Sequence, residues 1–398
     1  MASPITGPTS RPAALPLVPS DEEAMLREAV AGIAGRFGHD YFARVTAAGE
    51  APRELWDVLS AAGYTGVHIS EDHGGGGLGL TELAAVAEEV AAAGCPLLIM
   101  AVSPAIVGTV LERHGTDEQK ARWLRSIATG EQRFSFALTE PDAGSNSHEI
   151  RTLATPEGDG FRLCGTKTYI SGVEDAAGIL VVARTGTDER TGRGQLSLFM
   201  VDADADGLER QYIPTVLEAP EQQWTLFFDD VLVGRDCLIG EVGNGLRAVF
   251  DGLNPERIMS AVMCTGVARY ALDKAAAYVG ERKVWGVPIG SHQGVAHPLA
   301  EAKVQLELAR LMVQKAAMLH DAGLPAGEAS NMAKFAAAEA GIRCVDQAIQ
   351  AHGGNGFARE YGIADLYWVV RLLRTAPVSR EMVLNHVAEH ALGLPRSY

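Results

Sequence analysis

Two short segments carry the residues best suited to hold a flat, polar ligand. They are Phe136-Ala-Leu-Thr-Glu-Pro-Asp-Ala-Gly-Ser145 and Gly165-Thr-Lys-Thr-Tyr-Ile-Ser171. Gly144 allows close backbone approach because it has no Cβ atom. The hydroxyl groups of Thr139, Ser145 and Ser171 can donate or accept hydrogen bonds, and Tyr169 offers an aromatic face. Taken singly, these residues are more typical of turns and strand edges, but their combination favours a binding site.

A third segment, Gln350-Ala-His-Gly-Gly-Asn-Gly-Phe357, completes a pattern that resembles the acyl-CoA dehydrogenase family over nearly the whole chain. The resemblance implies FAD as cofactor, with Gly144 and Ser145 near its pyrophosphate or near coenzyme A, and Ser171 near the flavin N5. Asn146 stands where the family usually has Asp. The implied flavin-contacting positions are Phe136, Leu138, Thr139, Gly144, Ser145, Tyr169, Ile170 and Ser171.

The adenosine half of the cofactor is implied to bind elsewhere in the chain. Arg282-Lys-Val-Trp285, with Gln293 downstream, resembles the family segment that reaches an FAD bound by a neighbouring subunit. A guanidinium group suits a diphosphate and an indole can cover an apolar ring, although Arg282 also fits a solvated helix end. The other positions implied to contact this FAD are Gln350, Gly353, Gly354, Gly356, Ser379 and Glu381. The cofactor site would then require a homodimer or homotetramer.

The chemistry implied by the resemblance needs a carboxylate base. The α-proton of an acyl thioester leaves to this base while the β-hydrogen leaves as hydride, and desolvation strengthens the base. Many relatives supply it from the turn after the last signature, at a position that aligns with Pro377, which cannot be a base. The isovaleryl- and long-chain-like branch draws it from a helix, at the position of Glu256. Alternatively, Glu256 follows Pro255 as an acid in the first turn of a helix.

Two further consequences follow from this placement. Pro377 has no N–H for the thioester oxygen, so the donor is expected from the backbone of Ala376 or Val378. If Glu256 is not the base, Glu381 is the next carboxylate to test. Ahead of this turn, the family often has Arg-Asp-Ala. This chain has the bulkier Trp368-Val-Val370 there.

The substrate contacts are less specific. The resemblance implies Ser145 and Arg257 for the thioester or coenzyme A. Leu98 and Met100 follow a Gly-Cys-Pro break and fit either an apolar pocket floor or core packing. The run His73-Gly-Gly-Gly-Gly-Leu-Gly79 lacks the Lys-Ser/Thr of a phosphate-binding loop, so we interpret it as a turn before a helix.

Composition excludes several classes of partner. The chain has 398 residues and a formal net charge of −16, which argues against nucleic acid and anionic membranes. Its five cysteines are scattered, without metal-ligand spacing, as expected of free thiols in a reducing compartment. No signal peptide or spanning run is present, and we expect a cytoplasmic protein without a metal or a membrane partner.

Residue patterns divide the chain into three parts. Residues 1–19 are interpreted as a disordered extension, and a capping box at Ser20-Asp-Glu-Glu23 begins helices over 20–133. Short β-rich runs such as Ile179–Val182, Leu196–Val201 and Trp224–Phe228 predict a small antiparallel β domain over 134–239. Helical periodicity returns over 240–398, with an apolar stripe at Leu299, Val304, Leu308, Leu311 and Met312 and alanine faces over 333–340.

This order of helices, strands and a four-helix bundle is the α+β arrangement of the acyl-CoA dehydrogenase fold. The resemblance implies an FAD-dependent α,β-dehydrogenation of an acyl-CoA, with electrons passed to an electron-transfer flavoprotein. An acyl-ACP dehydrogenase and an acyl-CoA oxidase are alternatives within the enzyme class. A non-catalytic flavin-binding homologue is the alternative outside it, because Pro377 and the bulk at 368–370 depart from the commonest pattern.

Overall fold

The computed structural model describes residues 18–190 and 192–397, and the described chain begins with helices. Ser20 caps the first helix, its hydroxyl accepting a hydrogen bond from the Glu23 N–H at 3.2 Å, as predicted. The interpretation of 1–19 as an extension falls almost entirely on residues 1–17, outside the described residues. The N-terminal helices are α1 (Asp21–Ala34), α2 (Gly38–Ala48), α3 (Arg53–Ala61), α4 (Leu80–Ala92), η2 (Ala101–Gly108), α5 (Thr109–His114), α6 (Asp117–Gln119), η3 (Lys120–Leu124) and α7 (Arg125–Ala128).

The glycine run at 73–79 packs tightly on the chain itself. It leads from the short helix η1 (Glu71–His73) to α4. A Cβ atom added to Gly75 or Gly76 would lie 2.1 Å from the Ile69 carbonyl oxygen or 2.7 Å from that of Val67. Glycine is needed there for close backbone approach, consistent with a structural turn.

Eight strands form one twisted sheet in the middle of the chain. The order is β6-β7-β3-β2-β4-β5-β8, with β1 beside β4. Most pairs are antiparallel, as predicted, but β1 runs parallel to β4, and β2 meets β4 in parallel at one point. The sheet is therefore mixed, since β1 enters it directly from the helices. The bounds are β1 (Phe134–Ala137), β2 (Leu153–Glu157), β3 (Gly160–Ser171), β4 (Gly178–Thr187), β5 (Gly194–Asp202), β6 (Leu208–Tyr212), β7 (Gln223–Val233) and β8 (Leu238–Ile239).

Long helices make up the last part of the chain. The buried alanines Ala333, Ala337 and Ala340 let α10 approach its neighbours closely, and α10 packs against α8, α9 and α11. The predicted bundle is confirmed. Its elements are α8 (Gly245–Glu281), β9 (Lys283–Val284), β10 (Val287–Pro288), α9 (Gln293–Asp321), α10 (Gly327–His352), α11 (Leu366–Thr375) and α12 (Arg380–His386).

The apolar stripe predicted on α9 faces this core only in part, because Leu299 and Met312 pack against it and the other three members do not. Val304 and Leu308 are 59% and 63% exposed, and Leu311 is 47% exposed. The inward face of α9 instead carries Ala302, Leu306, Ala309, Val313 and Ala316. Periodicity identified an apolar face, but the small residues on the other face allow the closer packing.

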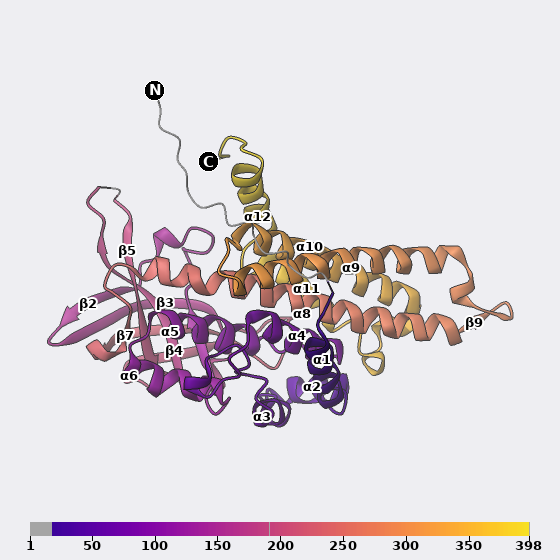
Figure 1. Ribbon diagram of the computed structural model, residues 1–398, viewed down its shortest axis with the longest axis horizontal. Coiled ribbons are helices and arrows are strands. Elements are labelled where there is room, and N and C mark those ends of the chain that lie inside the picture. Colours follow the sequence, from indigo (N-terminus) through magenta and orange to yellow (C-terminus); the bar gives the residue numbers. More distant parts are fainter. Residues whose placement is uncertain (1–17, 191, 398) are drawn as a thin grey trace.

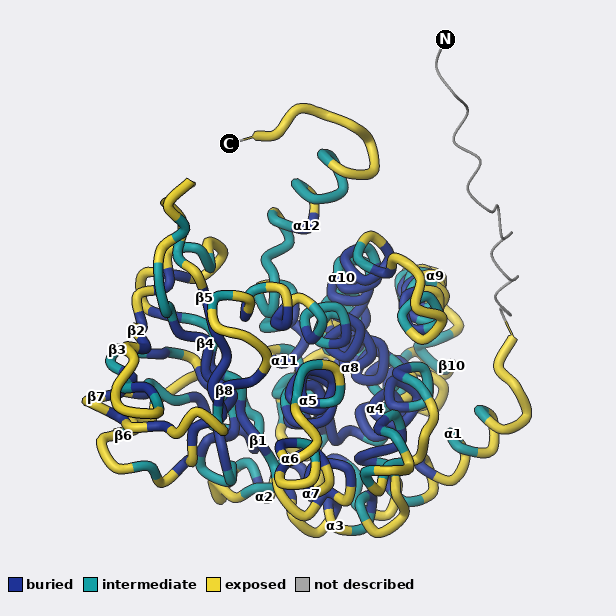
Figure 2. The backbone as a smooth tube through the Cα atoms, turned by 60° about the vertical axis from the view of Figure 1, so that its left-hand side comes forward, coloured by how far each residue is buried: buried dark blue, intermediate teal, exposed yellow. Residues whose placement is uncertain are grey.

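The molecule is elongated, with its sheet near one end of the long axis and the β9–β10 hairpin at the other (Figure 1). α8 packs on both α4 and α10, and its tube is dark blue where it runs through the interior (Figure 2). Within the described residues, no helix combines the length and apolarity needed to cross a membrane.

Candidate active site

The two predicted flavin segments lie side by side. The Leu138 carbonyl accepts a hydrogen bond from Lys167 Nζ at 2.9 Å. The Thr139 carbonyl accepts one from the Thr168 N–H at 3.0 Å. The chain from Phe136 to Thr139 is thus held against β3, where the second segment lies.

A buried ion pair supports this contact, and the sequence pattern gave no warning of it. Lys167 Nζ lies 2.9 Å from Glu140 Oε1, and the two residues are 0% and 6% exposed. Glu140 also accepts hydrogen bonds from the N–H groups of Arg151 and Thr152, at 2.7 and 2.9 Å. Burial lowers the pKa of Lys167 to about 8. Burial would raise the pKa of Glu140, but Lys167 and the hydrogen bonds outweigh it and leave that pKa lowered.

At the end of β3, Tyr169 is exposed, Ile170 is buried and Ser171 is hydrogen-bonded. The pairing with β7 shifts register between Lys167 and Ile170, where Tyr169 has a φ of 57° and is 63% exposed. Ile170 is 2% exposed, within the sheet core, so only its backbone can face a ligand. Ser171 Oγ accepts a hydrogen bond from Gln223 Nε2 at 2.9 Å, which orients the predicted N5 contact.

Glu221 is a second buried acid that the sequence pattern did not single out. Its Oε1 accepts a hydrogen bond from the Ile99 N–H at 2.9 Å, and its Oε2 is buried with no hydrogen-bond partner among the described residues. A Cβ atom at Gly172 would touch both Ile99 and Glu221. Burial raises the pKa of Glu221 to about 7. This carboxyl group therefore lies directly behind the Ser171 end of the flavin segment.

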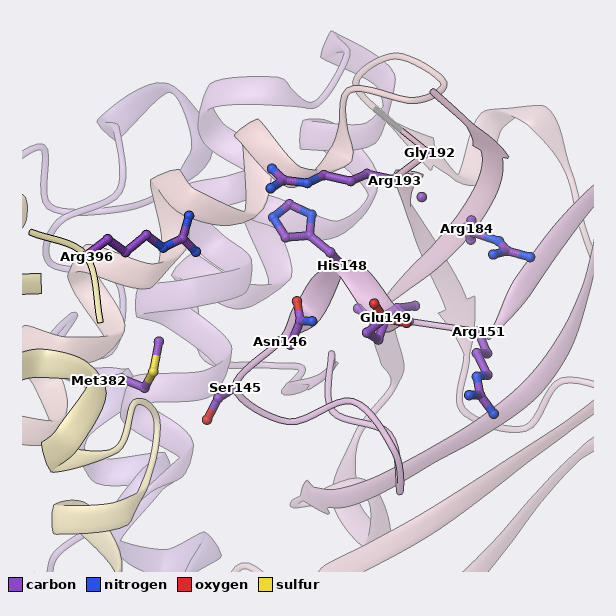
Figure 3. Close-up of a pocket in the computed structure, with 12 residues that line it drawn as sticks. Ser145, Asn146, His148, Glu149, Arg151, Arg184, Gly192, Arg193, Met382 and Arg396 are labelled. Atoms are coloured by element: carbon purple, nitrogen blue, oxygen red, sulfur yellow. The ribbon is translucent and has the colours of Figure 1, made fainter. Parts of the chain in front are cut away.

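Ser145 opens onto a cavity of about 770 Å³ between the β domain and the C-terminal tail. Figure 3 shows the guanidinium groups of Arg193 and Arg396 near the His148 ring, with Arg151 and Arg184 beyond Glu149. Gly144 stands beside it with nothing within 4 Å of an added Cβ atom. The cavity is suited to an anionic ligand. Its lining is Ser145, Asn146, His148, Glu149, Ile150, Arg151, Arg184, Gly192, Arg193, Gly194, Met382 and Arg396.

Glu256 lies well inside α8, which begins at Gly245 and continues through Pro255. The alternative of an acid in the first turn of a helix is therefore wrong. The residue is partly buried, and burial raises the pKa of its carboxyl group to about 7 against the opposing charges of Arg257 and Lys334. Such a group can accept a proton near neutral pH.

The predicted substrate residues fall into different environments. Arg257 Nη1 donates to Asn254 Oδ1 at 3.0 Å, and burial lowers the pKa of Arg257. Leu98 is partly buried against the main core, but Met100 is only 1% exposed and packs within that core. Leu98 thus stays a candidate for the pocket floor, while the side chain of Met100 is committed to the core.

The turn after α11 has one expected donor already engaged. The Ala376 N–H donates to the Leu372 carbonyl at 2.9 Å as α11 ends. Ser379 Oγ accepts from the Met382 N–H at 3.2 Å and so caps α12. Glu381 is exposed in the first turn of α12.

The bulky side chains at 368–370 lie partly in the core and partly at the surface. Val369 and Val370 are 6% and 0% exposed, whereas Trp368 is 45% exposed. Two of the three side chains therefore fill the space under α11.

The residues predicted for the adenosine half lie at the other end of the molecule. Arg282 and Gln293 are exposed on either side of the β9–β10 hairpin. Trp285 is at its tip, with a φ of 54° and 89% of its surface exposed. Figure 1 shows this hairpin at the far end from the sheet. These residues cannot join the flavin segments of their own chain in one site.

The glycine-rich segment meets the base of the same hairpin region. The Tyr278 ring near the end of α8 stacks on His352 at 4.2 Å, and Asn355 Nδ2 donates to Tyr278 Oη at 3.1 Å. Gln350 at the end of α10 is exposed, as are Gly353 and Gly354. The structure therefore brings the predicted positions over 282–293 and 350–354 to the same end of the molecule.

Gly356 differs from the other glycines of this segment. A Cβ atom there would lie 2.6 Å from the Ile349 carbonyl oxygen, whereas Gly353 and Gly354 have nothing within 4 Å. Gly356 is therefore explained by packing on α10, and the expectation that it approaches FAD is not needed.

These residues fit FAD. The Tyr169 ring is exposed beside an oriented Ser171 hydroxyl, as a flat ring with polar edges requires. The open space at Gly144, Gly353 and Gly354 leaves backbone accessible to a ligand. The Trp285 indole is 89% exposed even though the His292 ring lies edge-on to it at 6.2 Å, as expected if it covers a ring bound elsewhere. Within the described residues, no group of three or more His, Cys, Asp or Glu could hold a metal ion.

Comparison with known proteins finds matches to all three parts of the chain. Residues 20–131, 135–231 and 243–392 match the models of the acyl-CoA dehydrogenase N-terminal, middle and C-terminal domains. The chain is 50% identical to "Acyl-CoA dehydrogenase FadE12" of Mycobacterium tuberculosis over 96% of its length and 98% of that protein. It is 32% identical to "Caffeyl-CoA reductase-Etf complex subunit CarC" of Acetobacterium woodii, over 81% of this chain and 85% of that one.

Solved structures agree with these matches. The glutaryl-coenzyme A dehydrogenase in complex with glutaryl-CoA superimposes with a TM-score of 0.91 at 28% identity, covering 96% of this chain and 98% of that one. An acyl-CoA dehydrogenase from Geobacillus kaustophilus gives 0.88 at 28% identity, covering 94% and 98%. With three matching domains, a close relative and a shared fold, the chain belongs to the FAD-dependent acyl-CoA dehydrogenase family of oxidoreductases.

Proposed function

We propose that the chain dehydrogenates an acyl-CoA between its α and β carbons, with Glu256 as the general base. The observation that carries this proposal is the position of Glu256 in the interior of α8, where burial raises its pKa to about 7. A base with a pKa near the working pH combines a useful ionised fraction with real basicity. A carboxylate in an ordinary first turn would have neither the burial nor the shift.

Bound FAD supplies the hydride acceptor of this chemistry. The chain supplies Glu256 for the α-proton, and the segments at 136–139 and 169–171 hold the ring. The Ala376 N–H already donates to the Leu372 carbonyl. We therefore assign the Val378 N–H as the hydrogen-bond donor to the thioester oxygen. An oxyanion donor of this kind contributes about 3 kcal/mol to lowering the barrier.

Glu256→Gln tests the proposal. The swap keeps the shape of the side chain and removes its basicity. We expect the variant to retain its yellow FAD and its thioester binding, and to lose flavin bleaching under anaerobic conditions by about a thousandfold or more. Glu381→Gln tests the alternative base, and Glu241→Gln, at an exposed acid with no proposed role, is the control. If Glu256→Gln bleaches at a rate near that of the unaltered enzyme, the base lies elsewhere.

Coenzyme A is the proposed carrier because of the arginine-lined cavity at Ser145. Coenzyme A carries a diphosphate and a 3′-phosphate, whereas the pantetheine arm of an acyl carrier protein has a single phosphodiester. Five basic side chains, His148, Arg151, Arg184, Arg193 and Arg396, surround the cavity. Guanidinium groups bind phosphate through paired hydrogen bonds. A single phosphodiester would use few of them.

Arg193→Gln tests the carrier. We expect the KM for an acyl-CoA to rise by about fivefold to tenfold, on the scale of one charge-assisted hydrogen bond, with kcat unchanged. The same acyl group on pantetheine should show no change in KM. Arg190→Gln is the matched control, because Arg190 lies on the same β4–β5 connection without lining the cavity. Equal effects on both thioesters would argue against phosphate recognition.

Assembly and the electron acceptor complete the proposal. The split of the FAD residues between opposite ends of the molecule supports a homo-oligomer, and the exposed stripe on α9 supplies an apolar face for it. The relative from an Etf complex supports an electron-transfer flavoprotein as acceptor. Reoxidation of the bleached enzyme by such a flavoprotein rather than by oxygen would separate a dehydrogenase from an oxidase.

A further inference from the structure

Lys334 on α10 is a buried cation to which the proposed mechanism gives no role. It is 1% exposed. Its Nζ donates to the Arg374 carbonyl at 3.1 Å and also to the Val378 carbonyl. These carbonyls stand on either side of Ala376 and Pro377. One ammonium group thus ties together both ends of the turn that carries the proposed oxyanion donor.

A second residue of α10, Glu339, also binds both ends of this turn, on its more exposed side. Glu339 Oε1 lies 2.9 Å from the Nε atoms of both Arg374 and Arg380. All three side chains are about one-third exposed, so these pairs contribute little to stability. The hydrogen bonds of Lys334 form out of water and are charge-assisted, which makes them the stronger constraint.

Lys334 also places a positive charge close enough to act on Glu256 from another helix. α10 packs along α8, and the charges of Arg257 and Lys334 both act to lower the pKa of Glu256 against its burial. Burial lowers the pKa of Lys334 to about 8, with Cys264, Glu381 and Glu256 opposing that shift and Arg257 adding to it. At neutral pH the ammonium group is therefore still charged.

We infer that Lys334 is a positioning residue, which holds the Arg374–Val378 turn against α8 and supplies a fixed positive charge to Glu256. The inference rests on the proposed role of Glu256. Two predictions of different kinds follow. Loss of the hydrogen bonds should misplace the turn, and loss of the charge should make the carboxyl group harder to ionise.

The test compares Lys334→Met with Lys334→Arg in the FAD-loaded enzyme, by anaerobic flavin bleaching with an acyl-CoA across pH. Lys334→Met should slow bleaching at neutral pH by roughly tenfold to a hundredfold, the scale of a misplaced reacting group. Its acid limb should move to higher pH, because Glu256 loses a neighbouring cation, so the deficit should shrink as pH rises. Lys334→Arg keeps the charge and should return the acid limb to its original position.

Lys303→Met is the control, because Lys303 is an exposed lysine on α9. If Lys334→Met does not fold, Lys334→Gln replaces it as a neutral side chain that still donates hydrogen bonds, checked by FAD content and thermal melting. An unchanged acid limb in the neutral variant, or the same loss at every pH, would overturn the inference. The proposed function fails separately, if Glu256→Gln itself still bleaches.

Discussion

The flavin end and the adenosine end of this molecule are built in opposite ways. At the flavin end, a buried ion pair and main-chain hydrogen bonds hold the segments 136–140 and 167–171 together. At the adenosine end, Trp285 stands 89% exposed on a two-stranded hairpin. On the proposed assembly, one half of the site is rigid within the chain, and the other half acts only when a second chain meets it. Substitutions at the two ends should therefore fail differently, one in folding and the other in cofactor binding.

The largest expected effect is at the buried ion pair. Lys167→Met leaves Glu140 charged and 6% exposed without its partner, so the free energy of unfolding should fall by about 3–5 kcal/mol. Chemical denaturation would measure this loss. Lys283→Met, at an exposed lysine of the hairpin, should change stability by less than about 0.5 kcal/mol.

A double substitution sharpens that result. Lys167→Met combined with Glu140→Leu removes both charges and should recover part of the stability lost by the single change. If Lys167→Met is as stable as the unaltered chain, the rigid character assigned to the flavin end is wrong.

An intermediate effect is expected at Glu221, and it depends on pH. The folded state raises the pKa of this group from 4.5 to about 7, so the folded state holds the proton over a range in which the unfolded chain has lost it. Stability should therefore fall as pH rises from about 4.5 to 7 and stay lowered above that. Glu221→Gln removes the penalty and should stabilise the protein at pH 8 by up to about 3 kcal/mol.

Thermal melting at two pH values checks this prediction. At pH 4.5 the variant and the unaltered chain should melt together, since both are then neutral at this position. Glu241→Gln, at an exposed acid, should have little effect at either pH. A Glu221→Gln variant that is less stable than the unaltered chain at pH 8 would contradict the prediction, because the folded state would then favour the ionised carboxylate.

The smallest expected effect on folding is at the hairpin, where the affinity for FAD should nevertheless change. Trp285→Ala should leave the free energy of unfolding of the FAD-free chain within about 0.5 kcal/mol. Affinity for FAD should fall by about tenfold, near 1.4 kcal/mol, when the indole no longer covers the ring. Fluorescence titration of the apoprotein with FAD measures it. Trp368→Ala, at a half-exposed indole on α11, is the control, and equal FAD affinity in both variants would contradict the assignment.

Much of the architecture follows from local patterns in the chain. The change from helices to strands near Phe134 and the alanine packing of α10 were readable because each depends on periodicity and on residue size. The α9 stripe was predicted correctly only for Leu299 and Met312, which pack on the core, and not for Val304, Leu308 and Leu311. Helical periodicity of apolar residues shows that one face of a helix will be covered. It does not show whether Leu308 will be covered by its own chain or by another.

Motifs name candidate site residues, but they do not identify buried charges. The flavin segments and Glu256 come from the resemblance and stay predictions, whereas nothing in the local sequence marks Lys167, Glu221 or Lys334 as buried. Their burial depends on partners distant in sequence, such as Glu140 for Lys167 and the turn carbonyls for Lys334. The helix that runs through Pro255 was missed because proline normally marks a helix start.

The hairpin at the far end of the molecule has a genetic consequence. If each chain completes the cofactor site of its neighbour, a chain with a defective hairpin harms the flavin of its partner and not its own. A chain lacking Glu256 is inactive in its own site but still supplies an intact Trp285 to the site of its neighbour. Mixing the Trp285→Ala and Glu256→Gln chains should then create sites that have both an intact base and an intact hairpin. Two impaired alleles would then complement one another in the mixed assembly.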